Sequence, residues 1–389
     1  MSERIVIASK NQILYYNASK LLYLNSQYLK NYKKNIDEIN RKYEWKTQGV
    51  NAMFMGAGRS PVNVNVVEQA VVNGVSLLDS EDKIIYSVEV ENNSGVFIKY
   101  INDDKEMEHH VIHDAKVGFY NLDYNRTTGK VVVAVQQSPT ERNIGILDIN
   151  NSRYSIITEG DSIDNNPVWG KANPENIYFD STGVGRNGQG IVLGFSTKVI
   201  NKLNTQTGEM SEIISFDGYD CFQPKVDGED NLYFIKRPYQ SLFKNSVSLK
   251  DIIFMPFKIL KAIFKWIEFF TIRHTGEPLI TGGSNPAKSK EQDPQEIIIN
   301  GNIINAQKVM KENTARGEKY PGIAPKEWEL VKMDKNGGFS CIKKGVMGFD
   351  VDSAGNIVYS NGKYIIRILE GGKEEVVGKI DMIDKMLII

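Results

Sequence analysis

Three of the four histidines in this 389-residue chain stand close together, in the run Glu108-His-His-Val-Ile-His113. Imidazole nitrogens are common ligands of zinc and copper, so this spacing raises the question of a metal site. The surrounding residues predict a β-strand, in which successive side chains point to opposite faces. On a regular strand His109 and His113 lie about 13 Å apart, and His110 points away from both. The run therefore predicts no shared ion, and we expect no resident metal or cofactor in the chain.

A glycine-rich run at 183–190 matches the pattern Gly-x-Gly-x-x-Gly. A phosphate cradle of this kind needs a strand before it and a helix N-terminus after it. Residues 191–203 favour a further strand, so we expect a hairpin loop without nucleotide chemistry. No Gly-x-Ser-x-Gly elbow is present, and few histidines could act as a general base. The chain is therefore predicted to be non-enzymatic, and a metal-dependent propeller hydrolase or lactonase is an alternative.

The segment 256–272 combines a broad apolar face with a lysine stripe and predicts a cationic amphipathic helix. Pro256 suits the first turn of such a helix. The helix has three interpretations: packing on its own domain, docking in a protein groove, or lying on an anionic membrane surface. Its candidate partner-binding residues are Lys258, Lys261, Phe264, Lys265, Trp266 and Ile267.

Arginines in predicted loops extend this candidate surface. We expect Arg59, Arg186 and Arg237 to contact a partner. The chain carries 47 basic and 48 acidic side chains, a balance that makes a nucleic-acid partner unlikely for the whole domain. The beginning of the chain shows no apolar export segment, and the charges in 249–272 argue against a membrane-spanning helix. We therefore expect a cytoplasmic protein, with membrane association as an option.

Short apolar runs follow Asp-, Asn- and Gly-bearing turns along the whole chain. They begin at Ile84, Val131, Ile177, Leu232 and Ile357, which are 47, 46, 55 and 125 residues apart. Steps of about 40–50 residues are typical of one four-stranded propeller blade, and the longest step indicates a blade with an insertion. Strands at 384–389 and 4–8 would complete a first blade. The sequence thus predicts an all-β fold with helical insertions, a six-bladed β-propeller closed by pairing of its N- and C-terminal strands. Seven blades, or two β-sandwiches, are alternatives.

Two insertions interrupt this single propeller of residues 1–389. The first, 25–75, lies between blades 1 and 2 and opens with apolar residues spaced by three and four, which predicts an amphipathic helix. The second, 239–325, lies in blade 5 and contains the cationic helix. The strand assignment places both on the same face of the propeller. Loops on a rigid scaffold commonly carry function, so we expect the recognition surface there.

The repeats Asp227-Gly-Glu-Asp-Asn-Leu-Tyr-Phe234 and Leu203-Asn-Thr-Gln-Thr-Gly-Glu209 resemble those of the TolB-like six-bladed propeller family, over about residues 76–240 and 326–389. Gly276-Glu-Pro-Leu-Ile-Thr-Gly-Gly283 and Gly322-Ile-Ala-Pro-Lys-Glu-Trp-Glu-Leu330 are similar to segments of bacterial propeller proteins encoded beside MoxR-type ATPases and von Willebrand A-domain proteins. This second resemblance implies a protein-interaction scaffold or adaptor in a bacterial assembly. Its partner would be an AAA-type ATPase or a von Willebrand A-domain protein. A peripheral membrane-surface adaptor is the alternative.

Overall fold

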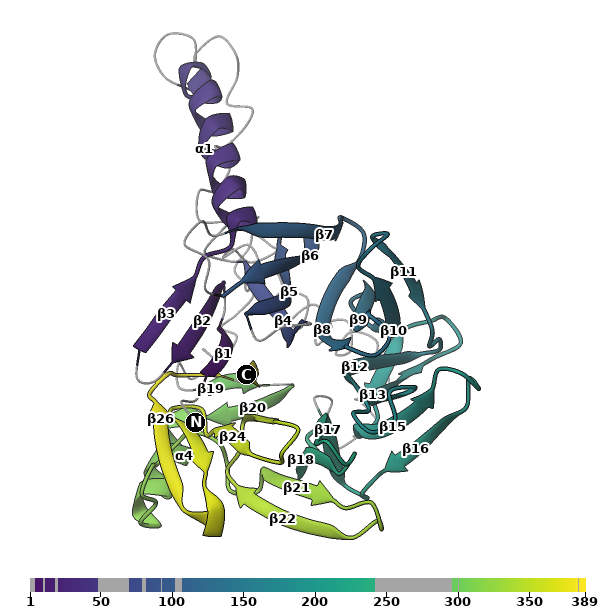
Figure 1. Ribbon diagram of the computed structural model, residues 1–389, viewed down its shortest axis with the longest axis vertical. Coiled ribbons are helices and arrows are strands. Elements are labelled where there is room, and N and C mark those ends of the chain that lie inside the picture. The colour runs from purple at the N-terminus through teal and green to yellow at the C-terminus, as the bar shows by residue number, and fades with distance from the viewer. Residues whose placement is uncertain are drawn as a thin grey trace, which may run out of the picture.

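The structure of the chain is a computed structural model that describes residues 4–9, 11–17, 20–47, 70–78, 82–91, 93–101, 107–241, 296–299, 301–383 and 385–389. Within these ranges the chain is mostly β, and its helices lie between strands. Small sheets surround a common centre in a propeller-like arrangement (Figure 1). The predicted all-β class with helical insertions is confirmed at this level.

The first sheet joins the two ends of the chain. Its strands lie in the order β27 (Lys385–Ile388), β1 (Arg4–Ser9), β2 (Gln12–Asn17) and β3 (Lys20–Leu24). β1 and β27 are antiparallel, with Val6 opposite Leu387. The sequence predicts this pairing of head and tail strands. β27 is therefore the innermost strand of a four-stranded sheet whose other three strands come from the start of the chain.

Three further sheets each contain four antiparallel strands arranged in their order along the chain. One comprises β4 (Val71–Leu77), β5 (Lys83–Val90), β6 (Asn93–Tyr100) and β7 (Glu108–Asp114). Another comprises β17 (Tyr219–Val226), β18 (Leu232–Pro238), β21 (Glu329–Met333) and β22 (Phe339–Lys344). The last comprises β23 (Gly348–Val351), β24 (Ile357–Ser360), β25 (Ile365–Ile368) and β26 (Glu374–Gly378), with a short 3-10 helix, η2 (Glu370–Gly372), before β26.

A nine-stranded sheet completes the ring. Its first run is β8 (Gly118–Asn125), β9 (Lys130–Ser138), β10 (Glu141–Asp148) and β11 (Arg153–Ile156). Its second run is β12 (Ser162–Trp169), β13 (Asn176–Arg186), β15 (Val199–Asn204) and β16 (Met210–Ile214), with β14 (Val192–Phe195) paired to the end of β13. Among the described residues, strand pairing between the two runs is limited to a single parallel pair, in which Arg142 lies opposite Ile163. The strands within each run are antiparallel.

The innermost strands make the centre of the molecule. In the order β4, β8, β12, β17, β23 and β27, each contacts the next, and β27 in turn contacts β4 (Figure 1). One carboxylate, Asp123 of β8, bonds to both neighbouring strands. It accepts hydrogen bonds from the Ser76 hydroxyl of β4 at 3.0 Å and from the Trp169 amide of β12 at 2.9 Å. A local sequence motif cannot show such a contact, because its partners come from different sheets.

A second carboxylate also bonds to both neighbouring innermost strands, on the other side of the ring. Asp350 of β23 is 4% exposed. Its oxygens lie 2.8 Å from Lys225 Nζ of β17 and 2.8 Å from the Ile388 amide nitrogen of β27. Burial alone would lower the pKa of Lys225, but the charge of Asp350 raises it. Asp350 therefore ties the C-terminal strand to the body of the protein.

Asparagine and aspartate hold the turns on one face of the ring. The side-chain oxygen of the first turn residue accepts backbone N–H groups two to four positions further along the chain. These residues are Asn125, Asp148, Asn204, Asp227, Asp334 and Asp352. Asx turns of this kind are short and locally determined. They join the first strand to the second, or the third to the fourth, so all of them lie on the same face. We call it the turn face.

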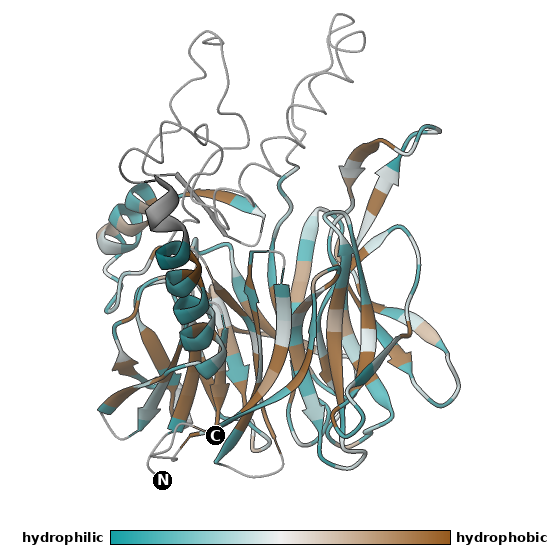
Figure 2. Ribbon diagram, turned by 90° about the horizontal axis from the view of Figure 1, so that it is seen from above, coloured by the Kyte–Doolittle hydropathy of each residue, from teal (hydrophilic) through white to brown (hydrophobic). Residues whose placement is uncertain are grey.

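The opposite face carries the long connections, and we call it the insertion face. α1 (Gln27–Thr47) follows β3, and the β13–β14 hairpin extends beyond its sheet. The connection from β18 to β21 contains the hairpin of β19 (Glu296–Ile299) and β20 (Asn302–Asn305), followed by α4 (Ala306–Ala315). Figure 2 shows the C-terminus on the turn face and the two hairpins on the other side, while α1 lies beside the ring and runs toward that other side. The sequence predicted a helix in the first insertion but neither α4 nor the β19–β20 hairpin. The predicted helix 256–272 lies outside the described residues.

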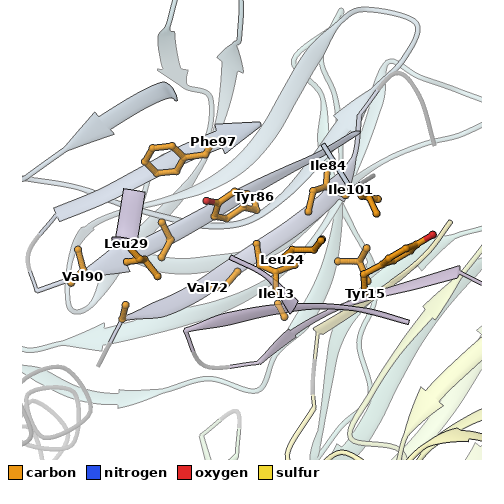
Figure 3. Close-up of a cluster of buried hydrophobic side chains, with 14 residues drawn as sticks. Ile13, Tyr15, Leu24, Leu29, Val72, Ile84, Tyr86, Val90, Phe97 and Ile101 are labelled. Atoms are coloured by element: carbon orange, nitrogen blue, oxygen red, sulfur yellow. The ribbon is translucent and has the colours of Figure 1, made fainter. Parts of the chain in front are cut away.

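α1 is attached to the ring through its first turn. The Glu108 carboxylate of β7 accepts hydrogen bonds from the amides of Gln27 at 3.1 Å and Tyr28 at 2.8 Å, and from the Tyr86 hydroxyl at 2.6 Å. The first amides of a helix have no partner within the helix, so an outside carboxylate stabilises them. Leu29 then enters the apolar cluster between the first sheet and the β4–β7 sheet (Figure 3). Its neighbours in that cluster include Ile13, Leu24, Val72, Ile84, Tyr86 and Phe97.

Candidate functional site

Four of the innermost strands, β4, β8, β12 and β17, contain a register irregularity close to the middle of the strand. At three of them a non-glycine residue takes a positive φ: Asn121 at 36°, Asn166 at 49° and Gln223 at 58°. This region of backbone space is uncommon for residues other than glycine, although asparagine tolerates it better than most. A bulge bends its strand and redirects the local side chains. The bulges of β12 and β17 bring Asn166 and Gln223 into hydrogen-bond contact with Asp180 of β13.

Arg142 of β10 is the first charged group of this cluster. Its guanidinium donates hydrogen bonds to Gln136 and, at 3.1 Å, to Asn165. It also lies 4.0 Å from the centre of the Tyr120 ring, whose hydroxyl donates to Glu89 at 2.6 Å. The Arg142 Nε is buried and has no hydrogen-bond partner among the described residues. Burial lowers the pKa of Arg142, and the nearby negative charges only partly oppose the shift.

Asp180 of β13 and Lys198 form the second part of the cluster. Asp180 is 1% exposed and accepts hydrogen bonds from the Asn166 side chain at 2.6 Å and from the Gln223 amide at 3.0 Å. Burial raises the pKa of Asp180, although the charge of Lys198 acts in the opposite direction. Burial likewise lowers the pKa of Lys198, and Asp180 opposes that shift. The two side chains therefore stabilise each other's charged forms.

Arg237 and Asp220 form a buried ion pair in the β17–β22 sheet. The Arg237 Nε and a terminal guanidinium nitrogen each lie 3.2 Å from Asp220 Oδ2. The guanidinium also lies 4.5 Å from the Phe222 ring centre and 4.9 Å from that of Trp328. The other carboxylate oxygen of Asp220 accepts the Lys198 amide at 3.0 Å. The pair thus links the cluster to the start of β21, just after the second insertion.

The arrangement is a charge-balanced network. Glu89, Asp180 and Asp220 face the three cations Arg142, Lys198 and Arg237 within one buried polar region. Buried charges are strongly destabilising unless they are paired and hydrogen-bonded. The contacts of this network satisfy most of these groups and fix the positions of several sheets relative to one another. Its chemical role is therefore to position strands beneath the insertion face.

A small cavity of about 50 Å³ lies close to the innermost strands. Its lining includes Asn121, Asn166, Gln223, Lys225 and Lys385. A volume of this size holds a few water molecules. In the part of the chain that the structure describes, no group of three or more histidine, cysteine, aspartate and glutamate side chains is placed to hold a metal ion.

The candidate partner-binding arginines have different surroundings. The side chain of Arg186 is 24% exposed, pairs with Asp161 at 2.8 Å and donates to Thr140 at 3.1 Å. It is the last residue of β13, next to the turn of the β13–β14 hairpin on the insertion face. Arg237 is only 1% exposed. The expectation that it contacts a partner is therefore wrong, because its guanidinium is committed to Asp220 inside the protein. The other candidates, Arg59, Lys258, Lys261, Phe264, Lys265, Trp266 and Ile267, lie outside the described residues.

The structure also shows how the glycine-rich run and the histidine run fold. The Gly-x-Gly-x-x-Gly run lies at the end of β13 and in the turn to β14, so the prediction of a hairpin loop is confirmed. The prediction that His109 and His113 share one side of the strand, with His110 pointing away from both, is wrong. β7 contains a bulge at Val111, because Ile112 lies opposite Val96 while His110 lies opposite the next residue, Phe97. This extra residue turns His110 and His113 to the same side of the strand.

Sequence reasoning missed the cluster of Arg142, Asp180 and Lys198 altogether. Arg142 and Asp180 lie on different strands, Lys198 immediately precedes a third, and none belongs to a recognisable motif. A usable signal was nevertheless present. Asn166 and Gln223 each precede a proline, at corresponding places in two of the repeats. Proline lacks a backbone donor and marks a bulge or an edge within a sheet, so these two dipeptides could have indicated the bulges that gather the cluster.

No family model and no curated protein matches the chain. Its fold does match solved structures. The structure of TolB from Acinetobacter baumannii aligns with a TM-score of 0.54 at 8% sequence identity, over 99% of this chain and 66% of the TolB chain. A chain of the nidogen/laminin complex aligns with a TM-score of 0.49 at 8% identity, over 99% and 98% of the two chains. An oligogalacturonate lyase from Vibrio parahaemolyticus aligns with a TM-score of 0.40 at 8% identity, over 95% and 71%.

At 8% identity the match to TolB shows the fold alone. The chain thus has the fold of TolB-like propeller proteins, and the expected resemblance is confirmed at that level. It spans 66% of the length of the TolB chain, just under two thirds.

Proposed function

We propose that the chain is a six-bladed β-propeller, closed by its head and tail strands, that acts as a non-enzymatic protein-interaction scaffold. The six-blade count treats the single bridge between Arg142 and Ile163 as a contact between two blades. The circular order of contacts among the six innermost strands supports it. The recognition surface in this proposal is the insertion face.

The difference between the two faces carries the proposal. Six of the described turns on the turn face are short and closed by their own Asn or Asp side chains. The insertion face bears α1, the β13–β14 hairpin and the β19–β20 hairpin with α4. Additions that leave a regular scaffold on one side are the usual location of binding function.

Two exposed apolar side chains on these additions provide candidate contacts. Leu193 of β14 is 45% exposed and Ile303 of β20 is 47% exposed. Large apolar side chains at the tips of rigid elements can act as anchors when a partner buries them. Arg186 lies next to the turn of the same hairpin as Leu193 and keeps part of its surface open to solvent.

The buried network supports binding by keeping the surface rigid. Association is opposed by the entropy lost when loops become ordered. The Arg237–Asp220 pair and the hydrogen bonds of Asp180 fix the strands from which the second insertion and the β13–β14 hairpin leave. The hairpin and the second insertion therefore start from a preorganised base.

The partner in this proposal is a protein. The resemblance of the second insertion favours a bacterial AAA-type ATPase of the MoxR class or a von Willebrand A-domain protein, in the cytoplasm. The membrane alternative depends on residues 256–272, outside the described part of the chain. Among the described residues, no helix is long and apolar enough to cross a membrane.

A co-purification experiment from the native host tests the proposal. The tagged full chain is compared with Leu193→Asp, Ile303→Asp and the double variant. Met210→Asp is the matched control, because Met210 is 55% exposed but lies at the turn-face end of β16. We expect the double variant to lose a specific protein by at least about tenfold, which corresponds to 1.4 kcal/mol. The control should retain it.

Equal recovery of the same proteins by all four chains contradicts the proposal. Flotation of the full chain with anionic liposomes distinguishes the membrane alternative. If the chain floats, Phe264→Asp combined with Ile267→Asp should abolish flotation, because charges on the apolar face of the predicted helix prevent its insertion between lipid headgroups. A chain that never floats removes that alternative.

A further inference from the structure

The histidines of β7 form a close pair on the surface of the β4–β7 sheet. His113 Nδ1 lies 2.9 Å from His110 Nε2, and both residues are exposed. Their ring centroids are 4.9 Å apart. The pair exists because the bulge at Val111 places residues three apart on the same side of the strand. On a regular strand these two rings would point in opposite directions.

This nitrogen–nitrogen distance suits two adjacent ligands of one metal ion. Imidazole nitrogens bind first-row metals at about 2.0–2.1 Å. Two nitrogens at that distance from one ion are about 2.9 Å apart when they subtend a right angle, and about 3.3 Å apart at the tetrahedral angle. In the metal-free chain the two nitrogens share a hydrogen bond of 2.9 Å, so they are already as close as two ligands at a right angle. Square-planar and tetragonal sites with right angles are typical of Cu(II) and Ni(II).

We propose that His110 and His113 form a two-histidine surface site for a divalent transition metal, with Cu(II) the preferred ion. Cu(II) stands highest in the affinity order of first-row divalent metals at nitrogen sites. In the bound state His110 Nε2 and His113 Nδ1 each offer a lone pair, and each ring carries its proton on the other nitrogen. The open positions on the metal are filled by water or by a ligand from solution.

The surroundings hold the pair ready for a metal. The Phe97 ring contacts His110 edge-on, with centroids 5.5 Å apart, which restricts the orientation of that imidazole. Gly95 is the residue opposite His113 on β6 and contributes no side chain over it.

His109 provides a matched control on the same strand. It is exposed like its neighbours. Its ring contacts Tyr100, with centroids 6.0 Å apart, and lies away from the pair. His109→Asn therefore removes one imidazole without touching the proposed site. All variants are made on a Cys341→Ser background, because Cys341 is an exposed free thiol that would react with copper.

The test is a calorimetric titration of the full chain with CuCl₂, followed by electron paramagnetic resonance of the one-equivalent complex. We expect one site whose spectrum shows coordinated nitrogen. His110→Asn and His113→Asn should each weaken it by at least tenfold, since even loss of an outer partner of a metal ligand costs about 10–100-fold. His109→Asn should bind as the parent does. The proposal is overturned if the parent shows no such site, or if the three variants bind alike. Unchanged thermal unfolding of each variant separates loss of the site from misfolding.

Discussion

Removal of the Asp350 carboxylate should destabilise the protein severely, because one side chain joins three innermost strands. Asp350 is 4% exposed and lies 2.8 Å from both Lys225 Nζ and the Ile388 amide nitrogen. In Asp350→Ala the lysine of β17 remains partly buried without this partner, and the amide of the C-terminal strand loses its acceptor.

The size of the effect follows from these contacts. Removal of one partner from a buried ion pair costs about 3–5 kcal/mol. The Lys225 side chain is 25% exposed, so we take the lower end of this range of costs, about 3 kcal/mol. Loss of a hydrogen bond to a buried amide adds about 1 kcal/mol. The expected total is about 4 kcal/mol, a large part of the roughly 5–15 kcal/mol that stabilises a typical domain.

A double-mutant cycle in urea separates the ion pair from general damage. The free energy of unfolding is measured for the parent, Asp350→Ala, Lys225→Met and the double variant. Lys225→Met removes the buried cation and keeps an apolar chain of similar length. The double variant should therefore be at least about 1 kcal/mol more stable than the sum of the single losses predicts. Costs that add to within about 0.5 kcal/mol, or a loss below about 1 kcal/mol for Asp350→Ala, would refute the reasoning.

Three further predictions concern the packing of the ring, the attachment of α1 and the turn face. A Cβ at Gly74 would lie 2.9 Å from backbone atoms of Asn121. Gly74→Ala should therefore lower the free energy of unfolding, measured by heat or urea, by about 1–3 kcal/mol. The control Gly188→Ala, at a position with open space around it, should change that free energy by less than about 0.5 kcal/mol. Glu108→Gln should weaken the hold on the first turn of α1 by about 1–2 kcal/mol, seen as faster amide hydrogen exchange at Gln27 and Tyr28, and unchanged exchange there would contradict the anchor. Burial alone would raise the pKa of Asp227, but hydrogen bonds from Asn231 and the Glu229 amide lower it. The ionised Asp227 therefore stabilises the folded protein above the usual aspartate pKa of about 3.9. This contribution to the free energy of unfolding is lost as the pH falls through the lower pKa of the folded state. The difference in urea midpoint between the parent and Asp227→Asn should therefore shrink between pH 4 and pH 2, and a constant difference would be inconsistent with the shift.

The regular part of the fold could be predicted because each repeat contains its own signals. The turns at Asp227, Asp352 and Asn125 are closed by local hydrogen bonds, and the apolar runs after them become β18, β24 and β9. Local chemistry of this kind is visible in a single sequence. The pairing of β1 with β27 also followed, because the first sheet lacked an inner strand until the tail supplied one.

The site could not be predicted for the opposite reason. Arg237 was expected at the surface because it follows a strand and precedes a long insertion. Its partner, Asp220, lies on the neighbouring strand, and only the folded sheet brings the two together. The prediction for the histidines failed because of one extra residue: the bulge at Val111 changes which imidazole rings lie on the same side of β7. Bulges depend on pairing with a second strand, so the periodicity of one strand does not reveal them.

Site-specific photo-crosslinking in the native host tests most directly whether the insertion face is the recognition surface. A photoreactive amino acid is placed at Leu193 or Ile303 on the insertion face, and at Met210 or Phe339 on the outer strands near the turn face. All four side chains are large, apolar and between 45% and 55% exposed, so their intrinsic chances of reaction are similar. The account predicts that Leu193 and Ile303 crosslink to a common partner protein and that the other two positions do not. Crosslinks to that partner only from Met210 or Phe339, or equally from all four positions, would contradict it.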